Sequence, residues 1–492
     1  MSDTPSRPHP AVELSKQGAD AAVTWLRTTL GGRERMRVVV VLAAVLGLSG
    51  ADVTTVGAAA TELRHALHIT NTEIGLLIAV SSLVGALASV PFGMLADRTT
   101  RTRVLGLAIL LWGGAMIWSA TAPTFGQLLL SRLFLGGVTA AAGPMVASLI
   151  GDYFSAGERG RIYGFVLAGE LIGSGFGFAV TGDIAALSWR AAFVALSIPA
   201  FMLAVAVLRL PEPARGATDV LPVEEGHEQP AEAATGPTDA QLLAQERGIE
   251  PVHANVPDDP SRMSLPEAVR HVLAIRTNVV LIAASACGYY FLAGVQTFGI
   301  EFVRDQYGVG QLVANLVLLV AGGGAVLGVL AGGQIGDRLV RNGHLNGRIL
   351  VATLTATAAT AVFVPAIFTR GGLAAAGYLF AAAFFLSAQN PPLDAARLDI
   401  MVPLLWGRAE AIRTGLRSIA QALAPLIFGA VSDYVFGGGR AGLQWTFAVM
   451  LVPLAASAYL LYRGLRTYPA DVATAAHAHE RSQPVTAVTS GR

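Results

Sequence analysis

The stretch Gly93-Met-Leu-Ala-Asp97-Arg98-Thr-Thr-Arg101-Thr-Arg103 lies between two long apolar segments of the chain. Its pattern returns in the second half as Gly333-Gln-Ile-Gly-Asp337-Arg338-Leu-Val-Arg341, again between two apolar segments. In both copies a glycine precedes the aspartate by four residues, one arginine follows it directly, and a second arginine lies four residues after it. Two copies at matching places predict a duplicated bundle of membrane-spanning helices.

The chemistry of these residues indicates a gate at one end of the helices. A carboxylate at a helix end can accept hydrogen bonds from the backbone N–H groups that begin a neighbouring helix, and such a contact opens when one half moves against the other. The residues of the two gate motifs are Gly93, Asp97, Arg98, Arg101, Gly333, Asp337, Arg338 and Arg341. The alternative, ordinary positively charged cytoplasmic loops, explains the arginines but not the repeated glycine and aspartate.

The composition is that of a membrane protein. Of the 492 residues, 53% are hydrophobic and 14% are charged, and the mean hydropathy of +0.56 is too high for a soluble protein of this length. The 55 glycines suit close helix packing in lipid. The net charge of +1 gives no indication of a nucleic-acid partner.

Metal and cofactor chemistry is not indicated either. The single Cys287 lies in an apolar segment, so we expect neither a disulfide framework nor a thiolate metal site. The pair His477-Ala-His479 is interpreted as a polar tract rather than a metal site. We therefore expect no cofactor. We also expect no signal peptide, because no short apolar core is followed by a small-residue cleavage site.

Twelve apolar segments are long enough to cross a bilayer. In the first half they cover 36–60, 73–95, 103–121, 126–150, 161–183 and 190–210, and in the second half 276–301, 312–335, 348–369, 373–400, 411–434 and 443–464. The sequence therefore predicts an all-α membrane protein with twelve transmembrane helices in two six-helix pseudo-symmetric bundles.

The other segments complete the predicted domain organisation. In order, we expect a cytoplasmic tail at 1–35, the first bundle at 36–210, a linker at 211–264, the second bundle at 265–465 with a short amphipathic helix at 265–275, and a tail at 466–492. The linker is rich in Pro, Glu and Ala and is predicted to be disordered, because it cannot bury a core.

The short loops predict the orientation. Their arginines gather on one side: Arg98, Arg101, Arg103, Arg159, Arg161, Arg338, Arg341, Arg348, Arg408 and Arg413. The positive-inside rule then places both termini and the linker in the cytoplasm. We expect a multi-pass protein of the plasma membrane.

Two predicted spans carry glycines four residues apart. They are Gly169, Gly173 and Gly177 in the fifth span, and Gly324, Gly328 and Gly332 in the eighth. Each series forms a smooth ridge that another helix backbone can approach closely. We expect the two ridges to face each other across the interface between the halves and to slide, whereas the simpler interpretation is general helix packing.

The paired motifs, the six-plus-six spans and the long linker together resemble the major facilitator superfamily. The stretches that resemble its spinster-like branch are Gly50-Ala-Asp52, Ser131-Arg132-Leu-Phe-Leu-Gly136-Gly137, Asp152-Tyr-Phe, Glu158-Arg159-Gly-Arg161, Gly173-Ser-Gly-Phe-Gly177, Ser188-Trp189-Arg190-Ala-Ala-Phe193 and Pro211-Glu212-Pro213. The resemblance implies export of lysolipids and sphingoid phosphates, often with proton coupling. The chain departs from the branch at Val53, where an arginine is usual, and at Thr139, where a glutamate is usual.

Ionisable residues inside predicted spans ask for a reason, because a charge at the bilayer centre costs about 3 kcal/mol on insertion scales. The resemblance implies a cavity lined by the first, fourth, seventh and tenth helices. The candidates for a substrate cavity are Asp52, Arg132, Thr139, Glu170, Gln296, Glu301, Asn390, Asp394 and Arg397. Asp52 and Glu170 are also the proton-coupling candidates, and Glu170 is a possible replacement for the carboxylate missing at Thr139.

Each charged candidate has a structural alternative. Asp52 can be permanently satisfied by a neighbouring hydroxyl, and Arg132 can extend to the membrane interface. Glu170 can be a packing partner of the fifth helix. Glu301 and Asp394 lie close enough to helix ends to be solvated.

No nucleophile and base pair and no phosphate-binding loop is evident, so we predict that the protein is not an enzyme. The main prediction is a secondary active transporter that moves an amphipathic, lipid-like substrate across the plasma membrane by alternating access with proton coupling. Its expected partners are the substrate, protons and membrane lipids, without nucleic acid, and we expect a monomer. The alternatives are a multidrug/proton antiporter for lipophilic compounds and a non-transporting receptor or scaffold on a transporter fold.

Overall fold

The structure is a computed structural model that describes residues 24–96, 98–154, 159–214, 238–252, 263, 265–401 and 405–482. The first half contains α2 (Arg33–Ala58), α3 (Ala60–Leu67), α4 (Asn71–Ala96), α5 (Arg101–Thr121), α6 (Phe125–Thr139), α7 (Ala142–Tyr153), α8 (Arg159–Phe176), the π-helix η1 (Gly177–Thr181), α9 (Gly182–Leu187) and α10 (Trp189–Leu208). The second half contains α12 (Leu265–Ala274), α13 (Arg276–Tyr307), α14 (Gln311–Arg341), α15 (Gly347–Phe368), α16 (Gly372–Ala388), α17 (Asn390–Asp399), α18 (Trp406–Ala430), the π-helix η4 (Val431–Val435) and α19 (Gly439–Ser482).

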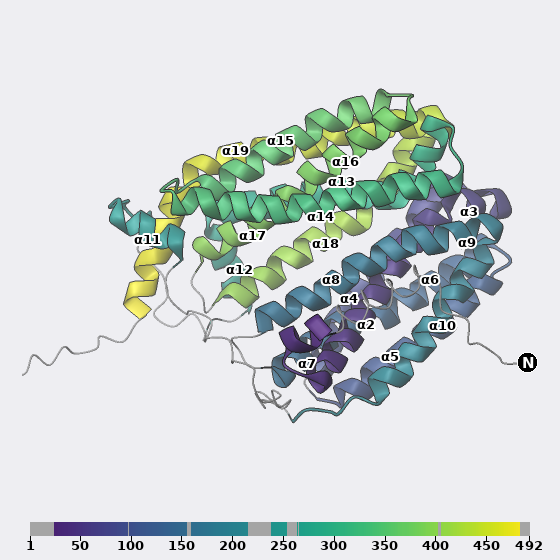
Figure 1. The fold of residues 1–492 in the computed structure, drawn as a ribbon, viewed down its shortest axis with the longest axis horizontal. Coiled ribbons are helices and arrows are strands. Elements are labelled where there is room, and N and C mark those ends of the chain that lie inside the picture. The colour runs from purple at the N-terminus through teal and green to yellow at the C-terminus, as the bar shows by residue number, and fades with distance from the viewer. Residues whose placement is uncertain are drawn as a thin grey trace, which may run out of the picture.

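The predicted fold class is confirmed. Among the described residues, 12 helices are long and apolar enough to cross a membrane, and they lie where the twelve spans were predicted. Figure 1 shows the first half, coloured purple to blue, beside the second half, coloured teal to yellow. Buried Leu, Val, Ala and Phe side chains fill the space between the helices of each half.

Irregularities of the backbone repeat at matching places in the two halves. The fourth span is interrupted between α6 and α7, and the tenth is interrupted between α16 and α17, just before Pro391 and Pro392. The fifth span contains the π-helix η1 before its last turns in α9, and the eleventh ends in the π-helix η4. Such breaks are common at functional sites, and their repetition supports the duplication that the sequence motifs predict.

The linker and the C-terminal tail differ from the sequence predictions. Part of the linker forms α11 (Asp239–Glu246), which begins with a capping box at Thr238. Ala240 and Ala244 are fully buried in a cluster shared with residues of α19. Disorder was therefore wrong for this segment, because a short amphipathic helix can bury its apolar face on a neighbouring helix. Likewise α19 continues to Ser482, so the segment 466–482 extends the last span.

The glycine ridges lie inside the halves and not between them. A Cβ at Gly173 would lie 1.9 Å from the backbone oxygen of Gly47 on α2, and a Cβ at Gly169 would lie 2.5 Å from that of Ala43. In the second half, a Cβ at Gly328 would lie 2.1 Å from the backbone oxygen of Phe384 on α16. Gly177 packs on α2, and Gly324 and Gly332 on α16. The expectation that the ridges face each other was wrong, because spacing predicts a smooth face but not its partner.

Three other glycines let the halves approach each other. A Cβ at Gly57 of α2 would lie 2.6 Å from the backbone oxygen of Gln296 on α13. A Cβ at Gly75 of α4 would lie 2.2 Å from the backbone oxygen of Pro425 on α18, and one at Gly429 would lie 2.3 Å from that of Asn71. Backbone contact of this kind permits close packing of α4 along α18.

Two aspartates seal the halves together at one end, which we name the Asp433 end. Asp433 of η4 accepts hydrogen bonds from the backbone nitrogen and the hydroxyl of Thr72 at the start of α4, at 2.6 and 2.7 Å. Asp183, which follows η1, accepts a hydrogen bond of 2.6 Å from Asn315 Nδ2 in the first turns of α14. Each half thus contributes one helix start and one aspartate at a π-helix, Asp433 within η4 and Asp183 directly after η1.

Two ion pairs reinforce the same end. Arg64 of α3 pairs with Glu301 of α13 at 2.7 Å, and Arg304 of α13 pairs with Glu62 of α3 at 2.8 Å. The opposite end holds Arg101 and Arg348, because α4 and α14 both run from the Asp433 end toward those residues. Between residues that the structure describes, no hydrogen bond or ion pair joins the halves at this Arg101 end.

A first prediction separates the two kinds of glycine. Gly75→Leu should push the halves apart at the Asp433 end, because its side chain meets the backbone of Pro425, whereas Gly173→Leu should destabilise the first half itself. Distances between spin labels across the Asp433 end and thermal unfolding measure the two effects. The control is Gly114→Leu, since nothing lies within 4 Å of a Cβ there. Equal unfolding temperatures for Gly173→Leu and Gly114→Leu would contradict the assignment.

A second prediction concerns the aspartate contacts. Asp433→Asn removes the negative charge that accepts two hydrogen bonds. The ratio of molecules closed at the Asp433 end to molecules open there should therefore fall roughly tenfold. Asp183→Asn should act in the same direction. Label distances across this end measure the populations, with the exposed Asp239→Asn on α11 as the control. If both variants keep the wild-type distances, these contacts do not decide the state.

Candidate functional site

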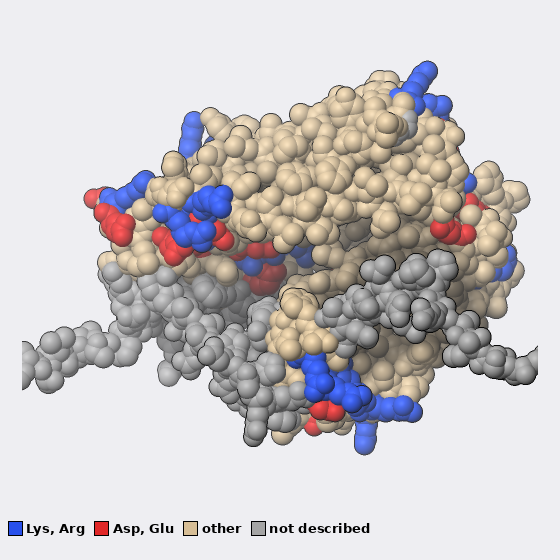
Figure 2. All heavy atoms as spheres, viewed as in Figure 1, with Lys and Arg blue, Asp and Glu red and all other residues tan. Residues whose placement is uncertain are grey.

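Charged side chains lie in a hollow between the two halves. Figure 2 shows basic and acidic atoms recessed there, while most of the surrounding surface is neither. Separately, ion pairs join four charged residues of the second half into one cluster: Asp394 and Arg397 of α17, and Glu410 and Arg413 of α18. Two of the predicted cavity residues, Asp394 and Arg397, therefore belong to a cluster that sequence reasoning described only in part.

These four residues form a network of alternating charge. Arg413 pairs with Asp394 at 2.9 Å and with Glu410 at 2.8 Å. Arg397 pairs with Glu410 and lies 3.8 Å from Asp394. Both helices place an acid and a base three residues apart, so each charge meets a partner on its own helix and on its neighbour. Two carboxylates and two guanidinium groups neutralise each other here.

Glu170 faces the second half from α8. Its side chain is exposed, and among the described residues its carboxylate has no hydrogen bond or ion pair. The charge that acts on it is that of Arg417 on α18. Burial in the packing of the fifth helix, the alternative raised by the sequence, is thus not what the structure shows.

Asp52 and Arg132 form a buried ion pair within the first half. Arg132 Nη1 donates to Asp52 Oδ1 at 2.9 Å, and the guanidinium carbon lies 4.6 Å from the ring centroid of Phe193. Both residues are buried, with 7% and 2% of Asp52 and Arg132 exposed. The partner of Asp52 is thus a guanidinium and not a hydroxyl, and Arg132 does not extend to the interface. Its Nε and Nη2 atoms have no hydrogen-bond partner among the described residues.

The remaining cavity candidates are divided between places. Thr139 is half-buried at the end of α6 and donates to the Gly136 oxygen of its own helix at 3.2 Å. Asn390 is half-buried at the break before α17. Gln296 and Glu301 lie at the Asp433 end, where Glu301 is fully buried and paired with Arg64. For Glu301 both the cavity and the solvated interpretation were wrong, because the last turns of α13 reach into the seal.

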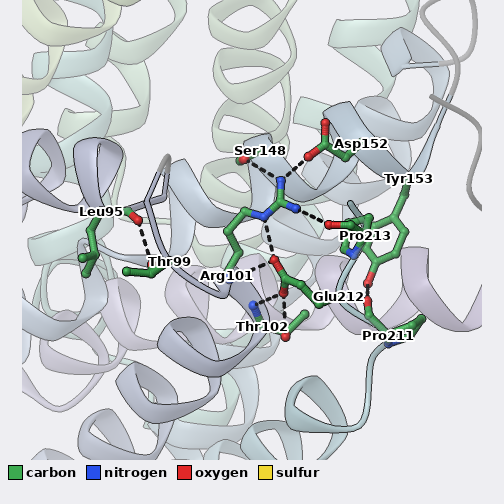
Figure 3. Close-up of polar contacts among 10 residues, drawn as sticks. All are labelled: Leu95, Thr99, Arg101, Thr102, Ser148, Asp152, Tyr153, Pro211, Glu212 and Pro213. Carbon is green, nitrogen blue, oxygen red and sulfur yellow. Dashed lines mark hydrogen bonds and ion pairs between the residues drawn. The ribbon is translucent and has the colours of Figure 1, made fainter. Parts of the chain in front are cut away.

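Arg101 of the first gate motif binds residues of its own half (Figure 3). Its guanidinium pairs with Asp152, donates to Glu212 Oε1 at 2.9 Å and to Ser148 Oγ at 3.1 Å, and donates to the Pro213 oxygen at 2.7 Å. The side chain is 1% exposed. This network connects the start of α5 to α7 and to the segment after α10.

Glu212 caps the start of α5. Its Oε2 atom accepts hydrogen bonds from the backbone nitrogen and the hydroxyl of Thr102, at 2.9 and 2.8 Å. Burial raises the pKa of Glu212, but the hydrogen bonds from Thr102 and Arg101 outweigh it and hold the pKa below its ordinary value. The carboxylate is therefore a permanent anion at a helix N-terminus, where negative charge is favourable.

The second gate motif has an equivalent network. Arg348, at the start of α15, donates to Asp337 Oδ1 at 2.8 Å and to Asp399 Oδ1 at 2.6 Å. Tyr468 of α19 donates to Asp399 as well. In the part of the chain described here, both motifs bind only within their own half, so their role as gates stays a prediction.

The other gate residues add little direct evidence. Arg98, Arg338 and Arg341 are exposed, and a Cβ at Gly333 would lie 3.3 Å from that of Pro391. Asp97 lies outside the described residues, and nothing is described of the surroundings of Gly93.

Sequence reasoning missed several residues of the site. Arg417 of α18 stacks on Tyr289 of α13, near the charged cluster, and Asp183 and Asp433 hold the seal. Arg417 was visible as an arginine inside a predicted span, four residues after Arg413. A single aspartate near a helix end carries no such signal.

Comparisons with known proteins give the family. The family model of the Major Facilitator Superfamily matches residues 42–398. The chain is 32% identical over 159 residues to the probable L-galactonate transporter of Escherichia coli and 29% identical over 163 residues to human protein spinster homolog 3. These stretches cover 31% and 32% of the chain, and 34% and 32% of the two relatives, so each match spans about a third of the relative. Mouse protein spinster homolog 3 is 24% identical over 394 residues, which is 76% of the chain and 70% of that protein.

Solved structures agree on the fold. A bacterial homolog to the human lysosomal transporter Spinster, in an inward-facing and unoccupied conformation, matches with a TM-score of 0.72 at 19% identity, over 89% of this chain and 98% of that one. A D-xylose-proton symporter matches with a TM-score of 0.60 at 16% identity, over 87% and 97%. Because the family model covers well over half of the sequence, this chain belongs to the Major Facilitator Superfamily, whose members are multi-pass membrane transporters and not enzymes.

Proposed function

We propose that the protein is a proton-coupled carrier of an amphipathic, lipid-like substrate such as a lysolipid. It works by alternating access as a monomer in the plasma membrane, with both termini and the Arg101 end in the cytoplasm. The observation that carries this proposal is the arrangement around the hollow: charged groups of both halves face each other, while polar contacts join the halves only at the Asp433 end of the described structure. A site between halves that close at alternate ends is the geometry of a carrier.

The lipid-like substrate is supported by the extent of the similarity. The match to mouse protein spinster homolog 3 runs over most of the chain, whereas that to the L-galactonate transporter is confined to about a third. The charged groups of the hollow lie between spans that are otherwise strongly apolar. A polar headgroup on an apolar tail suits both surfaces.

Proton coupling is supported by two carboxylates within spans. Asp52 is held by Arg132 alone among the described side chains, and Glu170 has no direct partner. If the surroundings of such a carboxylate change between the two states of the carrier, its proton affinity changes too, and a proton gradient then biases the cycle. The usual glutamate at Thr139 is missing, which makes Glu170 the best placed substitute.

A multidrug/proton antiporter is the second candidate. The observation that favours it is Glu170 itself, because an unpaired carboxylate in a hollow between apolar helices can bind a lipophilic cation. The scaffold alternative is disfavoured, since the family consists of transporters.

A third prediction tests the function in proteoliposomes. Purified protein should carry a labelled lysolipid faster with a pH gradient than without one, and should carry it faster than a lipophilic cation of similar size. Flux across a panel of lysolipids and lipophilic cations, with and without the gradient, measures this. Preferred flux of the cations would favour the antiporter, and gradient-independent flux of lysolipid would leave a facilitated carrier.

A fourth prediction assigns the coupling residue. Asp52→Asn keeps an acceptor for Arg132 but cannot bind a proton, so gradient-driven transport should be lost while substrate binding survives. Glu170→Gln should do the same if Glu170 carries the proton. Transport against pH and a binding assay on purified protein separate the two effects, with Asp239→Asn as the control. Wild-type pH dependence in both variants would exclude coupling through these groups.

A further inference from the structure

Arg417 is an arginine inside a membrane span, and no described carboxylate pairs with its guanidinium group. It lies eleven residues after Trp406, or about 16 Å along α18. Its guanidinium carbon lies 4.1 Å from the ring centroid of Tyr289 on α13. Among the described residues it makes no hydrogen bond or ion pair, and its Nε atom is buried without a partner. An arginine at this depth needs a reason that packing alone does not supply.

The charges around Arg417 do not neutralise it. Its nearest charged neighbours on the second half are the four residues of the alternating network, whose two acids already pair with Arg397 and Arg413. Arg417, Arg413, Asp394 and Glu170 all lie close enough to the Tyr289 hydroxyl to act on it electrostatically. Among the described side chains of α17 and α18 that form this group, three guanidinium groups thus face two carboxylates, which leaves one positive charge uncompensated.

Glu170 of the first half lies within electrostatic reach of this guanidinium, and the described structure has no ion pair between the two. Glu170 lies on α8 of the first half and Arg417 on α18 of the second half. An anion between the halves can therefore accept hydrogen bonds from Arg417 without displacing an existing partner.

Stacking defines which groups of Arg417 remain available. A guanidinium that lies over an aromatic ring has one face covered, while its N–H groups point outward in its own plane. A carboxylate or phosphate accepts two such N–H groups at once, in a fork geometry that a neutral hydroxyl cannot match. The orphaned Nε is one of these donors.

We propose that Arg417, stacked on Tyr289, is the binding subsite for a single anionic group of the substrate, a phosphate or a carboxylate. That the substrate has a lipid tail rests on the proposed function, whereas the anion-binding subsite rests on the geometry of Arg417 and Tyr289. It assigns net negative substrates to the carrier, and it assigns Glu170 the role of a competing anion across the hollow.

The test measures binding of four probes to purified full-length protein. Lysophosphatidylglycerol carries a net negative phosphate, lysophosphatidylcholine carries a phosphate balanced by a cation, monoacylglycerol is neutral, and gluconate is a carboxylate without a tail. The variants are Arg417→Gln, Arg417→Lys and Tyr289→Leu. The matched control is Arg463→Gln, because Arg463 also lies over a tyrosine, Tyr459, but on the exposed surface of α19.

The expected result is a loss that depends on charge. Arg417→Gln should weaken lysophosphatidylglycerol binding roughly tenfold or more and leave monoacylglycerol unchanged, since only the charged hydrogen bonds are removed. Arg417→Lys should weaken this binding less, because lysine keeps the positive charge but lacks the two parallel N–H donors of the guanidinium group. Tyr289→Leu should weaken the binding of lysophosphatidylglycerol, and Glu170→Gln should strengthen it. Arg463→Gln should change nothing.

Two outcomes would overturn the proposal. One is an equal loss for the neutral and the anionic lysolipid, or no preference of the wild type for either anionic probe over monoacylglycerol. The other is full recovery of anion binding in the exchanged variant Glu170→Arg/Arg417→Glu, which would make Arg417 only a partner of Glu170. Binding of gluconate without any lysolipid would instead contradict the lipid part of the proposed function and leave the anion subsite standing.

Discussion

A charge inside the membrane needs either a partner or water, and this constraint determines where the charged residues of this protein lie. Asp52 is buried with Arg132, and Arg101 and Arg348 are each buried with carboxylates of their own half. These pairs let helix ends and broken spans be held in fixed positions without exposing charge to lipid. Arg417 and Glu170 satisfy the constraint differently, since neither has an ion-pair partner among the described residues: Arg417 stacks on Tyr289, and Glu170 is exposed.

The packing between the halves shows how the carrier can move. The helices α4 and α18 pack against each other, and Gly75 and Gly429 bring their backbones together at the Asp433 end. On the other side, the described contacts of the fifth span with α14 are made by η1 and α9. A long smooth contact on one side and a short polar contact on the other allow rocking about the first. The polar contacts at the Asp433 end are few, and an equilibrium between two states requires that they differ in free energy by only a few kcal/mol.

Much of the fold followed from local sequence. Apolar length gave the twelve spans, and the repeated gate motif gave the two halves, because both signals lie within about 20 consecutive residues. The partners of the glycine ridges could not be predicted: Gly173 meets Gly47, and Gly328 meets Phe384, through contacts between distant parts of the chain. The helix in the linker was missed for the same reason, since its stability comes from α19 and not from its own composition.

The sequence could predict which charged residues lie deep in the spans, but not the direction in which their side chains point. Asp52, Arg132 and Glu170 were found from their depth in the spans, but the direction in which each points depends on packing. Glu301 was misplaced because α13 extends six residues past the predicted end at 301, which carries that carboxylate into the seal.

The seal has a physical logic that sequence patterns do not express. A π-helix widens its turn and redirects the residues within and directly after it, so Asp433 in η4 and Asp183 after η1 reach helix starts of the other half. Because the two contacts are related by the pseudo-symmetry of the halves, opening either one removes the same restraint on the same rocking motion.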